Sequence, residues 1–310
     1  IIMAGADNTI TIPAVCISQS DGLVLKGQLA NNINVTLGAA NVDGDVDNGV
    51  ITHEHTHGLS NRLTGGPSQA GCLSNAEHAG EGWSDYNALM LTTNWSTALV
   101  TDGVNKPRPM GTYVLGQPTT GAGIRNYKYC TDIAVNPLTY ANMGVAPIGT
   151  EVHNIGEIWC MALWEMTWAL IQTDGINPNL FDNAAAGGNS VAFKLVMEGM
   201  KLQPCSPGYV DARNAILQAD QNLYGGSHYC TIWTAFAKRG LGYSASQGSA
   251  FSATDQTPAN DLPPGPTISA QPTSQSVCVG VTVNFSITAS GPNRTHQWQV
   301  STNGGGSWTN

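Results

Sequence analysis

The sequence predicts an α+β protein with a helical central part and β-like segments at both ends. Two stretches near the start of the central part, residues 48–62 and 80–90, have helical character, and apolar residues recur at helical spacing from residue 153 onward. Short apolar runs of β type fill residues 1–38, and apolar and polar residues alternate in residues 268–310. These patterns divide the chain into residues 1–38, a main domain at 39–255, a linker at 256–267 and a last module at 268–310.

The first module and the loop after it contain few helix signals. Residues 1–5, 10–18 and 33–37 are predicted strands, and residues 19–22 are a predicted turn. Asp43, Asp45 and Asp47 then offer hard oxygen ligands of the kind Ca²⁺ prefers. The alternative is a solvated loop in which Asp47 or Asn48 caps the next helix, because the glutamate that ends an EF-hand loop is missing.

The main domain opens with the pattern H-E-x-x-H at residues 53–57. Residues four apart lie on the same face of a helix, so His53 and His57 can offer two imidazole nitrogens to one Zn²⁺. Glu54 can then act as general base toward a water at the metal. His55 points away from that face and is predicted to be no ligand. A glycine pair at Gly65 and Gly66 ends the predicted helix.

A zinc site of this type needs one more protein ligand. Glu81 is the first candidate, and Asp85 follows it at helical spacing, where its carboxylate can hold a ligand histidine by the second ring nitrogen. Glu77 and His78 are rival ligands. Two histidines, one glutamate and an open position for water make the arrangement of thermolysin.

The rest of the main domain changes from loops to helices. Residues 99–150 are rich in Gly, Pro and Asn, whereas four helices are predicted near 153–174, 191–202, 212–223 and 229–238. The Trp and Met residues of these helices are predicted to be core residues, and His228 is predicted to be structural.

The cysteines do not form a metal motif. There are seven, and no C-x-x-C pair occurs. Cys205 and Cys230 flank a helix and are a candidate disulfide, while pairings among Cys72, Cys130 and Cys160 stay open. Several free buried thiols are the alternative.

Composition excludes two classes of partner. The net charge of −9 argues against nucleic acid, which needs clustered Lys and Arg. No apolar run is long enough to span a membrane. The chain starts with Ile1 and has no signal peptide, so we interpret it as a fragment or a processed product, and its localisation cannot be taken from its start.

Combined motifs in the main domain resemble the fungalysin family of secreted metallopeptidases. The matching segments are HEHTHGLSNRLTGGP, GEGWSD, GIRNY, NPLTY, EVHNIGEIW and AFAKRGLG, within residues 41–255. The resemblance implies a thermolysin-like zincin fold with a mostly α-helical second lobe. It also implies one catalytic Zn²⁺, whose ligands would be His53, His57 and Glu81.

The same resemblance implies roles for other side chains. Glu54 would activate the zinc-bound water, and His153 would donate a hydrogen bond to the oxyanion. Asp85 would orient a ligand histidine, and Arg125 would hold a substrate carbonyl. Glu151 is a weak candidate to position His153. The tyrosine that shares oxyanion stabilisation is not located, and three tyrosines are open for this role: Tyr127, Tyr129 and Tyr140.

The flanking modules carry shorter resemblances. ITIPAVCISQSDG is similar to the closing part of a protease-associated domain, with an ordinary β-segment of the peptidase as the alternative. Cys278 followed by Trp298 resembles an immunoglobulin-like module that stops after too few strands to close a sandwich. We therefore expect most of the peptidase's first lobe to lie upstream of residue 1.

The sequence thus predicts a secreted, monomeric zinc endopeptidase that hydrolyses extracellular proteins and peptides. An inactive peptidase fragment that serves as a binding or adhesion module is the alternative. An aminopeptidase also uses H-E-x-x-H with a downstream glutamate, but the gap from His57 to Glu81 fits it poorly.

Overall fold

The computed structural model describes residues 19–31, 43–182, 186–291 and 296–310. The chain divides into two compact units, residues 1–40 and 41–310. In the first unit the described part contains α1 (Gln19–Gly27) and a short 3-10 helix, η1 (Leu29–Asn31). The turn predicted at residues 19–22 is therefore wrong. Lys26 lies in the last turn of α1, where a cation complements the helix dipole, and Gly22 does not break the helix.

The strands predicted at residues 1–5, 10–18 and 33–37 lie outside the described residues. The regular elements of the second unit are mostly helices, and its longer helices agree closely with the predicted ones. Its elements are η2 (Gly44–Val46), α2 (Asn48–Leu63), α3 (Gly80–Thr92), α4 (Asp102–Asn105), η3 (Tyr140–Asn142), α5 (Val152–Asp174), α6 (Gly188–Leu202), α7 (Tyr209–Tyr224), α8 (Tyr229–Lys238), β1 (Thr267–Ala270) and β2 (Thr288–Ser290).

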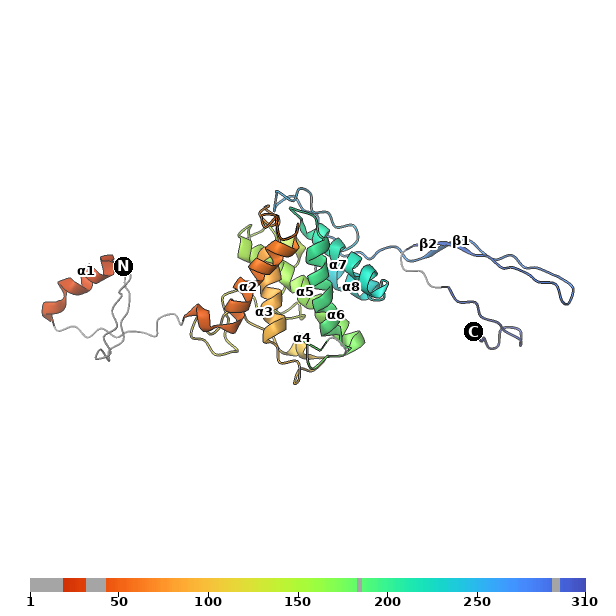
Figure 1. Ribbon diagram of the computed structural model, residues 1–310, viewed down its shortest axis with the longest axis horizontal. Helices are drawn as coiled ribbons and strands as arrows, with labels where there is room; N and C mark the ends of the chain where they lie inside the picture. Colours follow the sequence, from red (N-terminus) through yellow and green to blue (C-terminus); the bar gives the residue numbers. More distant parts are fainter. Residues whose placement is uncertain (1–18, 32–42, 183–185, 292–295) are drawn as a thin grey trace. The chain divides into compact units, whose positions relative to one another are not determined.

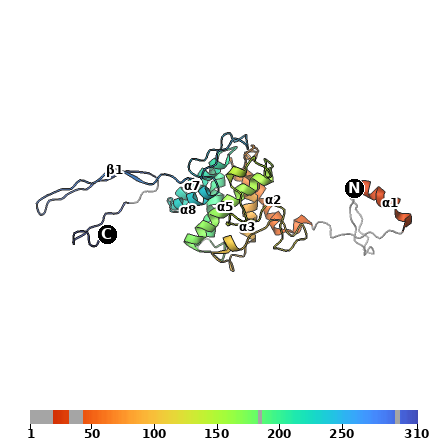
Figure 2. The same ribbon diagram turned by 180° about the vertical axis from the view of Figure 1, so that it is seen from behind.

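The long helix α5 is the centre of the helical part. It packs against α3, α6 and α8, and Figures 1 and 2 show it between α3 and the α6–α8 group. Trp159 and Trp164 of α5 are almost completely buried, as predicted for core residues. A Cβ on Gly82 of α3 would lie 2.5 Å from the carbonyl oxygen of Gly156. The two helices can therefore approach closely only because both positions are glycine.

Side-chain caps fix the starts of α2 and α5, two of the three helices that carry the predicted site. Asp47 caps α2, because its Oδ1 accepts hydrogen bonds from the backbone N–H of Gly49 at 2.8 Å and of Val50 at 3.2 Å. Its Oδ2 accepts from the N–H of Val114 at 3.2 Å, which ties a distant loop to the same helix start. Glu151 caps α5 in the same way.

A disulfide joins Cys72 to Cys205, with their Cα atoms 4.6 Å apart. The predicted pair of Cys205 with Cys230 is therefore wrong, since the chain brings residue 205 beside residue 72. The backbone N–H of Ser206 donates to the carbonyl of Cys72 at 2.8 Å. Cys130 and Cys160 are free and buried, as one alternative expected, whereas Cys230 and Cys278 are free and exposed. Cys16 lies outside the described residues.

The segment after the helices contains a short antiparallel strand pair. Thr267 pairs with Ser290 and Ile268 with Ala289. Strand β1 starts at the last residue of the predicted linker. The boundaries of the predicted modules stay predictions. Among the helices that the structure describes, none combines the length and hydropathy that a membrane crossing requires.

Candidate metal centre and active site

Helix α2 presents the two motif histidines on one face. His53 and His57 lie one turn apart, and their Nε2 atoms are separated by 3.1 Å. His53 is only 6% exposed, whereas His57 is partly exposed. The Nδ1 atom of His53 is 2.7 Å from Oδ1 of Asp85. A proton held in that hydrogen bond leaves the Nε2 lone pair of His53 free for a metal.

Helix α3 brings Glu81 to these nitrogens. Its Oε2 lies 3.0 Å from Nε2 of His53, and its Oε1 lies 3.5 Å from Nε2 of His57. One ligand atom from each of the three residues falls within 4.8 Å of the others. Oε2 of Glu81 is buried and accepts no well-aligned hydrogen bond, despite its short distance to His53. A buried carboxylate oxygen without a donor, beside two imidazole nitrogens, fits a cation held between them.

The pKa values point to the same place. Burial lowers the pKa of His53, but the hydrogen bond with Asp85 and the nearby carboxylate of Glu81 outweigh it and raise the value to about 9. Burial raises the pKa of Glu81, but the neighbouring histidines have a larger, opposite effect. The pKa of Glu81 is therefore below its ordinary value, and this carboxylate is ionised. Without a metal, the second ring proton of His53 thus lies on Nε2, where it faces the carboxylate of Glu81. A divalent cation would take that position in its place.

Asp85 connects His53 to an arginine and a tyrosine. The carboxylate is 1% exposed and accepts from Nε of Arg125 at 2.7 Å and from Nη2 of Arg125 at 2.8 Å. The hydroxyl of Tyr129 also donates to it. Burial raises the pKa of Asp85, but Arg125 and His53 lower it more, to about 2. Asp85 is therefore a fixed anion that holds the ring of His53.

Arg125, which was predicted to hold a substrate carbonyl, is hydrogen-bonded to Asp85. Its side chain is 7% exposed, and two of its nitrogens bind Asp85. Nη2 also lies 3.8 Å from Oε2 of Glu81. The guanidinium therefore lies at the edge of the cluster and neutralises part of its negative charge, and its role toward a substrate stays a prediction.

Helix α5 brings His153 to the other side of the cluster. Its Nε2 lies 3.5 Å from Oε2 of Glu81, and its side chain is half exposed. Its Nδ1 is 2.6 Å from Oε1 of Glu151, the residue that also caps the helix. The structure thus gives His153 a carboxylate partner that the sequence offered only as a neighbour two residues away. The sequence signal that could have identified Glu151 is its position just before the predicted start of this helix.

The remaining predicted residues also have clear places. Glu54 is exposed on α2, next to His53 in sequence, and its charge acts on His57. His55 is exposed as well. His78, a rival ligand, uses its Nδ1 to accept a hydrogen bond from the backbone of Gly80 at 3.2 Å. These positions leave Glu54 as the acidic group of α2 beside the two motif histidines.

The second rival ligand and two of the three tyrosines are engaged elsewhere. Glu77 is completely buried and accepts from the hydroxyl of Tyr140 and from the backbone of Tyr209. The hydroxyl of Tyr129 is bound to Asp85. Sequence reasoning gave Tyr129 no role in holding Asp85, and no spacing rule connects residue 129 to residue 85. The choice of an oxyanion tyrosine stays open.

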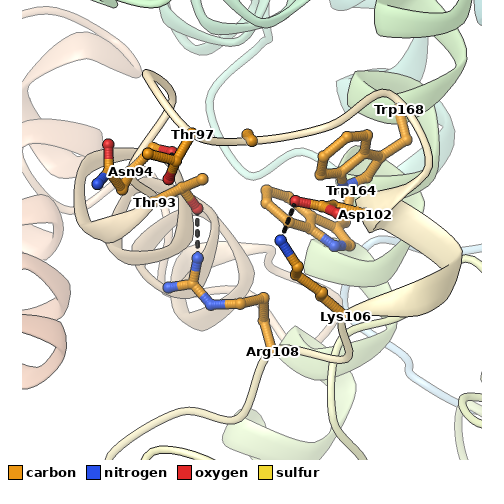
Figure 3. A pocket seen from close by; sticks show the side chains of 9 residues that line it. Thr93, Asn94, Thr97, Asp102, Lys106, Arg108, Trp164 and Trp168 are labelled. Carbon is orange, nitrogen blue, oxygen red and sulfur yellow. Dashed lines mark hydrogen bonds and ion pairs between the residues drawn. The ribbon is translucent and has the colours of Figure 1, made fainter.

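A separate pocket of about 180 Å³ lies at the C-terminal end of α3 (Figure 3). Its two cationic side chains are already satisfied. Lys106 pairs with Asp102 at 2.8 Å, and Arg108 donates to the hydroxyl of Thr92 at 2.9 Å. A cation at a helix C-terminus is favoured by the helix dipole, so Arg108 stabilises the end of α3. The two cations of this pocket therefore have protein partners and give no indication of a bound anion.

Comparison with known proteins adds the family. Residues 14–245 match the profile of the fungalysin metallopeptidases. The chain is 46% identical over 223 residues to extracellular metalloproteinase MEP of Pyricularia oryzae, with 68% of this chain and 33% of the relative covered. It is 41% identical over 238 residues to extracellular metalloproteinase 3 of Trichophyton rubrum, covering 75% of this chain and 35% of that protein.

A third relative is extracellular metalloproteinase mep of Aspergillus fumigatus, 42% identical over 231 residues, with 72% of this chain and 34% of the relative covered. The chain thus spans about a third of the length of the curated relatives it matches. The family match covers most of the chain, including both helices of the histidine–glutamate cluster and the helix that carries His153. The chain belongs to the fungalysin metallopeptidase family.

Proposed function

We propose that this chain carries the catalytic centre of a secreted zinc endopeptidase. The observation that carries the proposal is the convergence of His53, His57 and Glu81 from two helices, with Glu54 on the same helix as the two histidines. Two imidazoles and one carboxylate form a donor set that suits Zn²⁺ with a position left open. Zinc, when bound there, would polarise a peptide carbonyl and lower the pKa of a water molecule.

The chain's own residues would then handle the proton and the developing charge. Glu54 is exposed and lies next to a ligand, so it can take a proton from the attacking water and pass it to the leaving amine. His153 is half exposed and faces Glu81, so its Nε2 can donate to the oxyanion. Glu151 would hold that ring through Nδ1. Arg125 would hold a substrate carbonyl from the edge of the cluster.

The names of the relatives support a location and a substrate class for this chain. Three proteins at 41–46% identity are named extracellular metalloproteinases, which supports secretion and protein or peptide substrates for this chain. A monomer is the expected state. Calcium binding at the acidic loop stays a prediction. Two of its aspartates already accept backbone hydrogen bonds, since Asp43 accepts from the N–H of Asp45 and Asp47 caps α2.

The test compares zinc content and casein hydrolysis in the chain and in two variants. Glu54→Gln should keep about one zinc per chain and lose hydrolysis, because only the base is removed. His55→Gln is the matched control on the same helix, and it should keep both properties. Casein turnover by the Glu54 variant at the unmutated rate would refute the assigned base. An absence of zinc from the unmutated chain would refute the metal centre.

Two further outcomes separate the alternatives. Zinc binding without hydrolysis in the unmutated chain would indicate an assembled metal centre that does not act alone, and the same assay on a chain of the relatives' full length would separate an incomplete peptidase from a binding module. Peptides with a blocked N-terminus should still be cut, because an endopeptidase does not need a free amine. Loss of cleavage on blocking would indicate an aminopeptidase.

A further inference from the structure

Glu157 is a buried acid that binds the loop next to the candidate metal centre. It is completely buried on α5, one helical turn after His153. Its Oε2 accepts hydrogen bonds from the backbone N–H and from the side-chain Nδ2 of Asn126, each at 3.0 Å. Its Oε1 accepts from the backbone N–H of Tyr127 at 2.6 Å. One carboxylate therefore fixes the backbone of two consecutive loop residues.

The loop that Glu157 holds begins at the arginine of the site. Arg125 directly precedes these two residues, and its guanidinium binds Asp85 through two hydrogen bonds. Asp85 in turn holds Nδ1 of His53 at 2.7 Å. A continuous series of hydrogen bonds and one peptide segment thus leads from α5, through the loop, to a candidate metal ligand on α2.

We propose that Glu157 is a positioning residue, which holds Arg125 against Asp85 and so fixes the orientation of His53 toward the metal. The inference rests on the proposed metal centre. The proposal also gives α5 two roles at the site. His153 and Glu157 lie four residues apart on α5, so the same helix face presents a histidine to Glu81 and a carboxylate to the loop.

The chemistry requires a carboxylate at position 157. All three of its partners are N–H donors, so both of its oxygens must accept. Glutamine has the same shape but would place an NH₂ group against at least one N–H. At least one hydrogen bond would be lost, and a partly buried N–H donor would be left without an acceptor. The loop should then shift, and Arg125 should lose its alignment with Asp85.

Glu165 provides a matched control on the same helix. It is also buried on α5, but it pairs with Lys238 at 2.6 Å and with Arg239 at 2.8 Å, and neither partner belongs to the site. Substitution of this residue with glutamine also removes a buried carboxylate from its partners. It should lower stability without affecting the orientation of His53.

The experiment measures zinc affinity of the whole chain by competition with a chromogenic chelator, below the melting temperature of every variant. Partners of metal ligands change affinity about 10- to 100-fold when they are lost, and Glu157 acts one step further away. We therefore expect Glu157→Gln to weaken zinc binding about 3- to 10-fold. Glu165→Gln should stay within about twofold of the unmutated chain. Equal affinities for the chain and both variants would overturn the proposal.

Two arrangements keep the test decisive. If Glu157→Gln does not fold, Asn126→Ala removes the side-chain bonds of an exposed loop residue to Glu157 and to Asn154 but keeps both backbone bonds to Glu157, and it should weaken zinc binding by a smaller factor. Unchanged affinity in that variant would then overturn the proposal. Zinc affinity does not depend on turnover, so a chain that binds zinc but hydrolyses no casein counts against the peptidase proposal and leaves this inference testable.

Discussion

Glu77 should make the stability of this protein depend on pH. The residue is completely buried just before α3, and its Oε1 accepts hydrogen bonds from the hydroxyl of Tyr140 and the backbone of Tyr209. Its Oε2 is buried and has no hydrogen-bond partner. Burial raises the pKa of Glu77 from 4.5 to about 7, against the opposing effect of these hydrogen bonds.

The pKa difference sets the magnitude. A raised pKa means that the folded state binds a proton more tightly than the unfolded state does, so the stabilisation is complete below pH 4.5 and is lost as pH rises through about 7. A shift of roughly 2.5 units corresponds to about 3 kcal/mol. Glu77→Gln is neutral at every pH and can still accept from Tyr140. It should therefore match the unmutated chain near pH 4.5 and exceed its free energy of unfolding by up to about 3 kcal/mol at pH 8.

Urea denaturation of both metal-free chains, followed by tryptophan fluorescence, measures the difference at each pH from 4.5 to 8. The difference between the two chains removes the contribution of other titrating groups that the substitution does not touch. A difference that is constant over this pH range would refute the reasoning, because it would mean that Glu77 titrates alike in the folded and unfolded states.

Three other changes test the arrangement around the site. Asp85→Asn should weaken zinc binding about 10- to 100-fold in a chelator competition, because the ring of His53 loses its anionic partner. Replacement of Cys72 and Cys205 by serine should lower the free energy of unfolding by about 3 to 5 kcal/mol in urea titrations, since the bond closes a loop with a sequence separation of 133. Gly82→Ala should lower the melting temperature and cost about 3 kcal/mol, because the new Cβ would lie 2.5 Å from a carbonyl oxygen of α5.

Helices were predictable from the sequence where one local pattern decides the structure. Helix α8 has the predicted bounds, and α2 starts at Asn48 with Asp47 as its cap, as one alternative expected. Apolar periodicity and capping act within a few residues, so they can be recognised without knowing the fold. Helices α6 and α7 begin three residues earlier than predicted, at Gly188 and Tyr209, where a glycine and an aromatic residue gave no start signal.

Pairings between distant residues were not predictable in the same way. The predicted disulfide joined Cys205 to Cys230 because these two residues flank one predicted helix. The observed bond joins the loop between α2 and α3 to the loop between α6 and α7. Only the packing of α6 and α7 against the rest of the core brings these two loops together, and no local pattern encodes that packing.

The candidate site shows the same division between local and distant information. His53 and His57 share a helix face, so their spacing alone predicted a shared ligand. Glu81 could be ranked above Glu77 because Asp85 follows it by one turn. The contact of Tyr129 with Asp85 and that of Glu157 with the loop could not be predicted. Sequence spacing does not connect residue 129 or residue 157 to α2 or α3.

A close contact between two helices explains why the distant groups meet at all. Gly82 follows the candidate ligand Glu81 on α3, and Gly156 lies between His153 and Glu157 on α5. A Cβ on Gly156 would lie 2.4 Å from Cβ of Glu81, so any larger residue would push the two helices apart. The same contact therefore sets the distance from His153 to Glu81 and the reach of Glu157 to the loop before it. Two residues without side chains determine this geometry, which is why a search for chemically active side chains does not reveal it.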